Sequence, residues 1–203
     1  MDRVTAVDGL ILRSVPFREK DRLLSVWTEE RGRIRVVAQG ALLVANRLVP
    51  LGQCGLLVRL WLARGRELDR VTDFRILWCP TRIRQDWKAL AAFQTMVEVL
   101  EGGWLLEGAE PGLLPALVAW VRHLDDPSVD PALWLKEVLE ELLRMAGLRD
   151  ERDVTSDGDP LTGLEKVLSL WEQNLESPVR SRKVWVTGFE RDQRKTGAIQ
   201  RHN

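Results

Sequence analysis

The chain has 203 residues, 45% of them hydrophobic, with two cysteines and a formal net charge of zero. That length allows one large domain or two small ones, while two cysteines exclude a disulfide framework and cannot complete a zinc site. No apolar stretch approaches the roughly 18 residues of a membrane span, and the first residues lack the apolar core of a signal peptide, so we expect a cytoplasmic protein.

The first third of the chain contains short apolar, β-branched runs that are typical of strands, separated by charged or glycine-centred turns. We expect five strands, at residues 4–15, 22–28, 33–39, 56–63 and 68–77. Gly9 interrupts the first of them, as in a strand that carries a bulge or a sharp bend. Five short strands in so few residues favour a small closed β-barrel over an open sheet.

After Cys79 and Pro80 the apolar residues recur at steps of three and four, the mark of amphipathic helices. We expect four helices, at residues 83–100, 113–124, 131–145 and 161–175. The third has Asp130 as its expected N-cap, Pro131 at its first position and Gly147 just past its end. The predicted fold class is α+β, with a barrel domain at 1–79, an all-α domain at 80–186 and a basic, disordered tail at 187–203.

Charge is distributed unevenly along the chain. Residues 1–75 carry fourteen Lys/Arg against nine Asp/Glu, residues 76–177 nine against nineteen, and residues 178–203 seven against two. A basic β-region followed by an acidic helical region suggests a polyanion bound at one end and a protein partner held at the other.

The sequence contains no motif of an enzyme. A glycine-rich phosphate loop is missing, and the only histidines are His123 and His202. A Ser–His–acid arrangement built on His123 is conceivable, but a histidine near a helix end is the better interpretation. We therefore expect a binding protein that needs no cofactor and no metal.

Cations of the barrel region gather at its turns and on the third strand. Arg33 and Arg35 share one face of that strand, whereas Ile34 and Val36 point to the opposite side. In a five-stranded oligonucleotide-binding (OB) barrel, strands two and three and two flanking loops bind the nucleic acid. We therefore predict phosphate contacts from a set of basic residues, with Phe17 as a platform for base stacking: Arg18, Lys20, Arg22, Arg33, Arg35, Arg47 and Arg66. The alternative is a solvated face whose cations pair with nearby acids such as Glu19 and Glu29.

The run from Gly9 to Ala41 resembles the opening of the bacterial recombination-repair mediator family RecO. The family pattern is an apolar strand ending in Leu-Arg, a turn with Glu-x-Asp, a Thr-x-x-x-Gly hairpin and Ala-x-Gly. Here these motifs stand at Leu12-Arg13, Glu19-Lys20-Asp21, Thr28 to Gly32 and Ala38 to Gly40. The similarity continues through the fourth and fifth strands, the first helix with Arg84, Asp86 and Glu98, and the closing segment 164–185.

This resemblance implies an N-terminal OB-fold barrel and an all-helical C-terminal domain. It further implies binding of single- and double-stranded DNA, annealing of complementary strands, recombinase loading in the nucleoid, and two partners, the mediator RecR and the tail of the single-strand-binding protein. Two features differ from the family. Many relatives insert a four-cysteine zinc module, whereas residues 147–163 contain no cysteine, and the loop at 41–47 (ALLVANR) has one cation where relatives are rich in Lys, Arg and Ser.

Two functional hypotheses follow. In the first, the chain is a DNA-binding recombination mediator without catalytic chemistry. In the second, the acidic helical domain is an adaptor that docks partners and the barrel is its scaffold. An acidic, apolar partner tail would need a cationic pocket, for which Arg82, Arg84 and Arg122 are the candidates. Leu42, Leu43 and Val44 would either contact a protein or fold inward.

Overall fold

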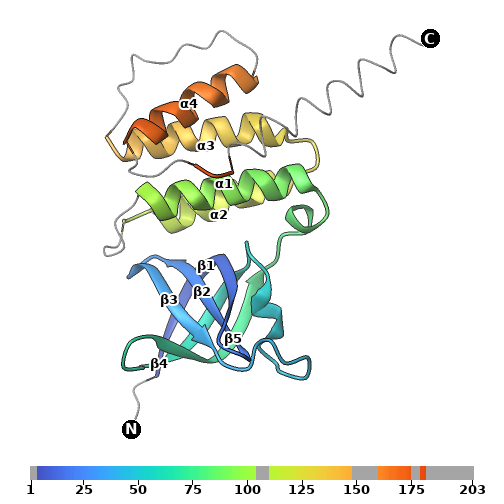
Figure 1. Ribbon diagram of the computed structural model, residues 1–203, viewed down its shortest axis with the longest axis vertical. Coiled ribbons are helices and arrows are strands. Elements are labelled where there is room, and N and C mark those ends of the chain that lie inside the picture. Colours follow the sequence, from blue (N-terminus) through green and yellow to red (C-terminus); the bar gives the residue numbers. More distant parts are fainter. Residues whose placement is uncertain (1–3, 104–109, 148–159, 175–178, 182–203) are drawn as a thin grey trace, which may run out of the picture. The chain divides into compact units, whose positions relative to one another are not determined.

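The computed structural model describes residues 4–103, 110–147, 160–174 and 179–181 (Figure 1). Within these residues it contains five strands and four α-helices, which confirms the α+β class. The strands are β1 (Val4–Phe17), β2 (Asp21–Thr28), β3 (Gly32–Ala38), β4 (Leu57–Ala63) and β5 (Asp69–Trp78). The helices are α1 (Trp87–Gly103), α2 (Leu113–Leu124), α3 (Pro131–Met145) and α4 (Pro160–Asn174).

Two short 3-10 helices were not predicted. The first, η1 (Val49–Gly52), lies between β3 and β4, and the second, η2 (Arg82–Arg84), precedes α1. Because η2 occupies the start of the predicted first helix, α1 begins at Trp87 rather than at residue 83. The expected end signals of the third helix are confirmed, since Asp130 accepts hydrogen bonds from the amides of Ala132 and Leu133.

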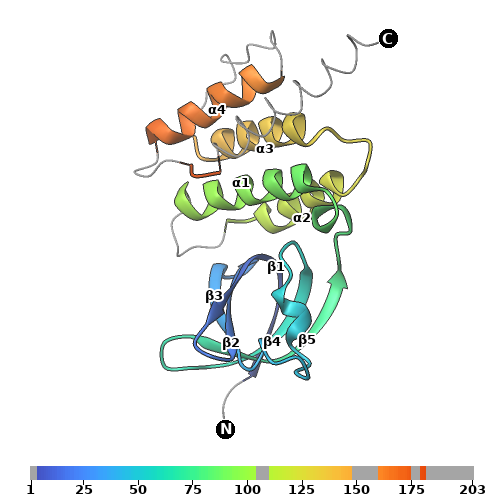
Figure 2. The same ribbon diagram turned by 45° about the vertical axis from the view of Figure 1, so that its right-hand side comes forward.

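The five strands pair in the order β1-β2-β3-β5-β4 and form a closed barrel (Figure 2). Closure is possible because β1 is long enough to pair with β4 through its first half and with β2 through its second half. Gly9 lies where the two pairings overlap, opposite both Thr28 and Val58. All neighbours are antiparallel except β3 and β5, which are parallel and meet at only two residue pairs.

Alternating side chains of the strands fill the barrel interior. Ile11, Leu24, Val36, Val58 and Leu60 are all completely buried in one hydrophobic cluster. Residues from the connection between β3 and β4 add to the same cluster, namely Ala41, Leu48 and Leu51. Arg33 and Arg35 occupy outward positions of β3, as the strand periodicity predicts.

The chain forms two compact units. Unit 1 comprises Met1–Gln85 and Leu105–Pro127, and unit 2 comprises Asp86–Trp104 and Ser128–Asn203. Helix α2 therefore groups with the strands and not with the other helices. The division after residue 79 remains a prediction, and the tail at 187–203 and most of the cysteine-free stretch at 147–163 lie outside the described residues.

A polar latch joins η2 to the end of α2 inside unit 1. The carboxylate of Asp125 accepts hydrogen bonds from the backbone amides of Thr81 and Arg82, at 2.8 and 2.7 Å. In return, the Arg82 guanidinium donates to the carbonyl oxygens of Leu124, at 3.3 Å, and Asp126. The latch satisfies carbonyl groups that a helix end leaves without intrahelical partners.

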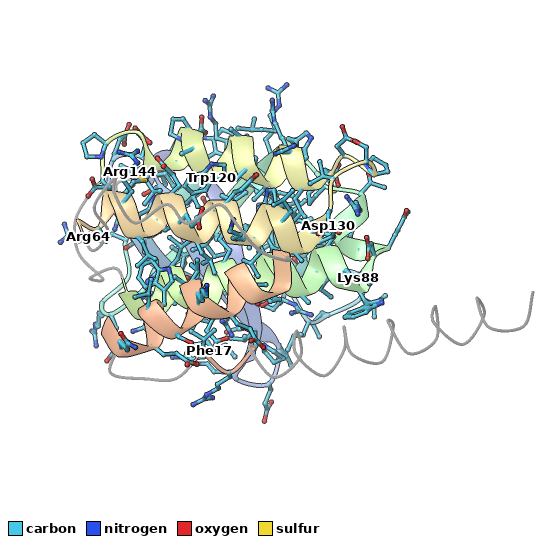
Figure 3. The ribbon with its side chains drawn as sticks, turned by 90° about the horizontal axis from the view of Figure 1, so that it is seen from above. Phe17, Arg64, Lys88, Trp120, Asp130 and Arg144 are labelled. Carbon is cyan, nitrogen blue, oxygen red and sulfur yellow. The ribbon has the colours of Figure 1, made fainter. Side chains whose placement is uncertain are left out.

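Unit 2 is built on α1, α3 and α4. The labelled residues Asp130 and Arg144 lie near the two ends of α3 in Figure 3. Trp171 of α4 is buried, and its indole nitrogen donates to the Leu139 carbonyl at 3.3 Å. The carboxylate of Glu98 on α1 accepts from the amides of Arg180 and Ser181 and from the Ser181 hydroxyl, at 2.7 to 2.9 Å, and so attaches that segment to the helix. Among the described residues, no helix is long and apolar enough to cross a membrane.

Candidate nucleic-acid interface

The turn between β1 and β2 presents the first group of predicted site residues. Arg18 has a φ of 55°, a left-handed conformation that suits a tight turn, and its guanidinium carbon lies 5.0 Å from the centre of the Phe17 ring. Arg18 and Lys20 are exposed, while Phe17 is half-buried. The turn therefore offers two cations beside an aromatic ring with one face already covered by a guanidinium group.

Arg35 is the most accessible predicted cation on the strands. It lies opposite Ser25 of β2, is exposed, and alternates with the buried Ile34 and Val36. Arg66, in the turn between β4 and β5, is exposed as well. Within the described part of the chain, four of the exposed predicted cations take part in no ion pair: Arg18, Lys20, Arg35 and Arg66.

Two further predicted residues are partly withdrawn from solvent. Arg22 is half-buried and packs over η1, where a Cβ on Gly52 would come within 3.1 Å of its guanidinium carbon. One of its terminal nitrogens donates to the Ser14 hydroxyl at 3.5 Å, near the limit of a hydrogen bond. Arg33 lies opposite the buried Trp27 and is itself half-buried. Both side chains pack partly against the protein while carrying a charge, so less of each is accessible to a ligand than of the exposed cations.

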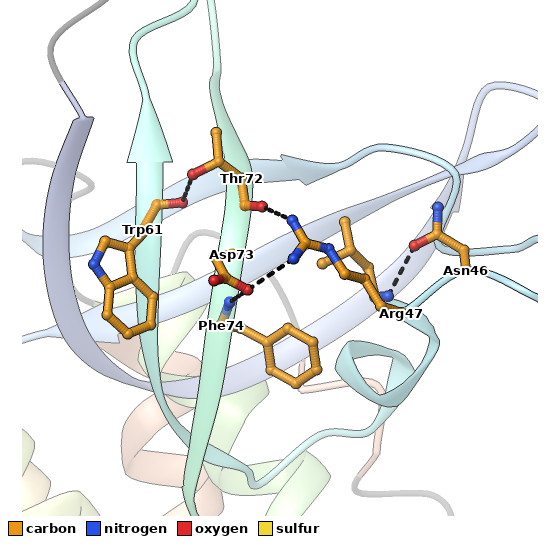
Figure 4. A network of polar contacts seen from close by, with 7 residues as sticks. Asn46, Arg47, Trp61, Thr72, Asp73 and Phe74 are labelled. Atoms are coloured by element: carbon orange, nitrogen blue, oxygen red, sulfur yellow. Dashed lines mark hydrogen bonds and ion pairs between the residues drawn. The ribbon is translucent and has the colours of Figure 1, made fainter.

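Arg47 is held by β5 and does not extend freely into solvent. One guanidinium nitrogen donates to the Asp73 carboxylate at 3.2 Å and another to the Thr72 carbonyl (Figure 4). Asp73 also accepts from the backbone amide of Phe74 at 2.9 Å. The Arg47 side chain remains about two thirds exposed, so a phosphate could compete for it only by breaking this ion pair.

The carboxylates that pair with these cations are not those nearest in the sequence. Asp21 and Glu29 accept from the backbone amides of Gly40 and Gly112, at 2.8 and 3.0 Å. The ion-pair partners come from β5, where Asp73 binds Arg47 and Asp69 binds Arg31 at 3.1 Å. The alternative hypothesis, in which acids neutralise all the cations of this face, therefore holds only in part. The carboxylates that do form ion pairs are distant in the sequence from the cations that they bind.

The unpaired cations do not form one compact cluster. Arg18 and Lys20 lie in the turn before β2, and Arg66 in the turn before β5, with Arg35 on the strand. The labelled Phe17 and Arg64, which stand for these two turns, lie well apart in Figure 3. An elongated ligand that runs from one turn across the strands to the other could use both.

A separate hollow of about 660 Å³ lies on the outer side of β1 and β4. Its lining includes Asp8, Glu29, Glu30, Arg59 and Trp61. Asp8 accepts two hydrogen bonds from Arg59, at 2.7 and 2.8 Å, and these lower the pKa of the Asp8 carboxyl. The excess of carboxylates makes this hollow unsuitable for phosphate groups, so it is not part of the proposed interface.

The three predicted partner-binding arginines have different environments. The Arg82 guanidinium belongs to the latch with α2, and Arg84 donates to the Pro80 carbonyl and the Gln53 side chain, at 3.2 and 3.0 Å. Arg122 is exposed and lies 5.6 Å from the centre of the Trp78 ring. Of the three, Arg122 combines exposure with an adjoining aromatic surface.

Comparison with known proteins gives a consistent set of relatives. The family model described as "Recombination protein O N terminal" matches residues 1–78. A protein named DNA repair protein RecO from Prosthecochloris aestuarii is 28% identical over 156 residues, which are 75% of this chain and 59% of that protein. The protein of that name from Frankia casuarinae is 33% identical over 144 residues, 69% of this chain and 58% of its own length. The chain thus spans less than two thirds of these relatives.

Proposed function

Because the chain belongs to the RecO family of DNA repair and recombination proteins, we propose that it binds single- and double-stranded DNA through an OB-fold barrel. In this proposal it anneals complementary strands and helps to load the recombinase onto DNA in the nucleoid. It acts by binding, without catalytic chemistry of its own. The closed five-stranded barrel supports the OB assignment, since OB folds are small barrels of five strands.

The observation that carries the proposal is the group of exposed, unpaired cations at the β1–β2 turn and on β3. Arg18, Lys20 and Arg35 keep their charge available because no described carboxylate neutralises them. Phosphate binding requires accessible cations and no particular spacing, so these side chains suit a backbone of any sequence. Arg66 would extend the contact to the β4–β5 turn, and Phe17 would stack on a base.

Annealing follows from the same physical effect. Two complementary strands repel each other through their phosphates until bound cations displace part of the counterion atmosphere and lower the repulsion. Contacts to phosphate carry no sequence information, so binding and annealing would not depend on sequence. The base edges would remain available for pairing, which annealing requires.

A titration of an unstructured fluorescent oligonucleotide with the full chain, repeated at several salt concentrations, tests the proposal. If about four phosphates of a single strand are neutralised, the logarithm of the binding constant should fall against the logarithm of salt concentration with a slope near −3. A slope near zero, or binding restricted to one sequence, would contradict it.

Partner docking is a second candidate function, and one observation favours it. The exposed Arg122 lies over the Trp78 ring, and the preceding residues Ile76 and Leu77 are each 41% exposed. A cation beside apolar groups suits an acidic, apolar peptide such as the tail of the single-strand-binding protein, and RecR is the other proposed partner. Partner capture that survives nuclease treatment and is lost in Arg122→Glu would support this role. Capture that disappears with nuclease would attribute it to shared DNA.

A further inference from the structure

The connection between β3 and β4 carries an apolar tip, formed by Leu43, Val44 and Ala45, that stands out into solvent. Val44 is 98% exposed and Leu43 46% exposed. On both sides of the tip the chain returns to the barrel core, where Ala41 and Leu48 are buried. Single exposed aliphatic residues are common on proteins, so what matters is how this tip is held and what surrounds it.

The tip is tied to neighbouring elements on both sides. Before it, the Gly40 amide donates to the Asp21 carboxylate at 2.8 Å, and the Leu42 amide to the Lys20 carbonyl at 2.9 Å. After it, Arg47 is bound to β5 by its ion pair and its bond to a backbone carbonyl (Figure 4).

Within the tip, the backbone N–H of Asn46 donates to the Leu43 carbonyl at 2.9 Å, which closes a turn. Gly40, with a φ of 70°, allows this path, since a Cβ there would lie 2.5 Å from the Asn46 side chain. The folded barrel has therefore already ordered the backbone of the tip. Presenting Leu43 and Val44 to a ligand would require little further loss of conformational entropy.

Cations and an aromatic ring adjoin the tip. The bond from Leu42 to the Lys20 carbonyl places the tip directly beside the β1–β2 turn, which carries Phe17 and Arg18. A ligand at this place meets aliphatic groups and positive charges together. Single-stranded nucleic acid has both matching parts, because its bases have apolar faces and its phosphates are anionic.

We propose that Leu43 and Val44 insert between neighbouring bases of a single DNA strand bound along the β1–β2 turn, and hold that base step unstacked. This inference rests on the proposed DNA binding and adds to it a specific contact with the bases. Aliphatic side chains act as such wedges between base steps in other DNA-binding proteins. Because insertion uses apolar contact, it contributes affinity that salt does not screen.

A single-stranded oligonucleotide containing 2-aminopurine, whose fluorescence rises when the base is unstacked, tests the inference with the full chain. We expect the fluorescence to rise when the wild-type protein binds and to remain low with the double variant Leu43→Ser, Val44→Ser. The variant should bind about tenfold more weakly, as expected for the loss of two apolar side chains from a contact with the bases. Its salt slope should be unchanged, because no cation is removed.

A matched control replaces two exposed aliphatic residues elsewhere, Val4→Ser and Leu133→Ser, which are 50% and 41% exposed in the wild type. This control should behave like the wild type in both measurements. Tight, salt-dependent binding without any fluorescence rise would overturn the wedge and leave the proposed function intact. Absence of binding would overturn both. Loss of self-association in the tip variant, measured by sedimentation, with unchanged DNA binding would identify the tip as a protein contact and also overturn the inference.

Discussion

Replacing Arg18, Lys20 and Arg35 with glutamate is expected to lower the affinity for single-stranded DNA by two to three orders of magnitude at about 50 mM salt. This loss of affinity follows from the smaller number of counterions that the variant releases from the DNA. If about four phosphates are neutralised in the wild type and one contact remains in the variant, the salt slope should become shallower, from near −3 to about −0.7. The side chains are exposed and unpaired with described carboxylates, so their replacement should leave the fold intact. Fluorescence anisotropy at three salt concentrations measures both quantities.

The matched control makes the same change of net charge in unit 2, with Lys88, Arg144 and Lys166 replaced by glutamate. These residues lie on α1, α3 and α4 of unit 2. We expect its affinity to stay within about threefold of the wild type, because none of these residues belongs to the predicted interface of unit 1. Equal losses in the two variants would show that overall charge, and not the cations of the barrel, determines binding.

Replacing Gly9 with alanine is expected to destabilise unit 1 by about 2–3 kcal/mol, as overpacking of a close contact does. A Cβ at this position would lie 2.6 Å from a methyl carbon of Val26 and 2.7 Å from the carbonyl oxygen of Trp27. The carbonyl belongs to β2, so it cannot move away without disturbing the pairing with β1. Because Gly9 also faces Val58 of β4, the strain falls where the barrel closes.

Chemical denaturation followed by tryptophan fluorescence measures the effect. Val15→Ala on the same strand is the control, since Val15 is 37% exposed and its truncation should change stability by no more than about 0.5 kcal/mol. A Gly9→Ala protein as stable as this control would show that β1 has more room around residue 9 than the distances indicate. The DNA affinity of the folded Gly9→Ala protein should be close to wild type, because no cation is altered.

Several features of the chain followed from local patterns. The period of two in β3 predicted that Ile34 and Val36 face the core and that Arg33 and Arg35 face outward. The end signals of α3 were readable because an N-cap depends on its own residue and the next three positions. Such interactions lie within a few residues, so the sequence alone contains them.

The state of each cation depended on tertiary structure. Arg47 and Asp73 are 26 residues apart, and Arg31 and Asp69 are 38 apart, so their ion pairs exist only because the closed barrel brings β5 beside β3. The acids close in sequence instead bind backbone amides. Likewise, the sequence left open whether Leu42, Leu43 and Val44 fold inward. The fold leaves Leu42 half-buried and Leu43 and Val44 exposed, while Ala41 and Leu48 on either side are buried. Charge and periodicity are properties of residues and their neighbours, whereas neutralisation and exposure depend on which distant segments the fold brings together.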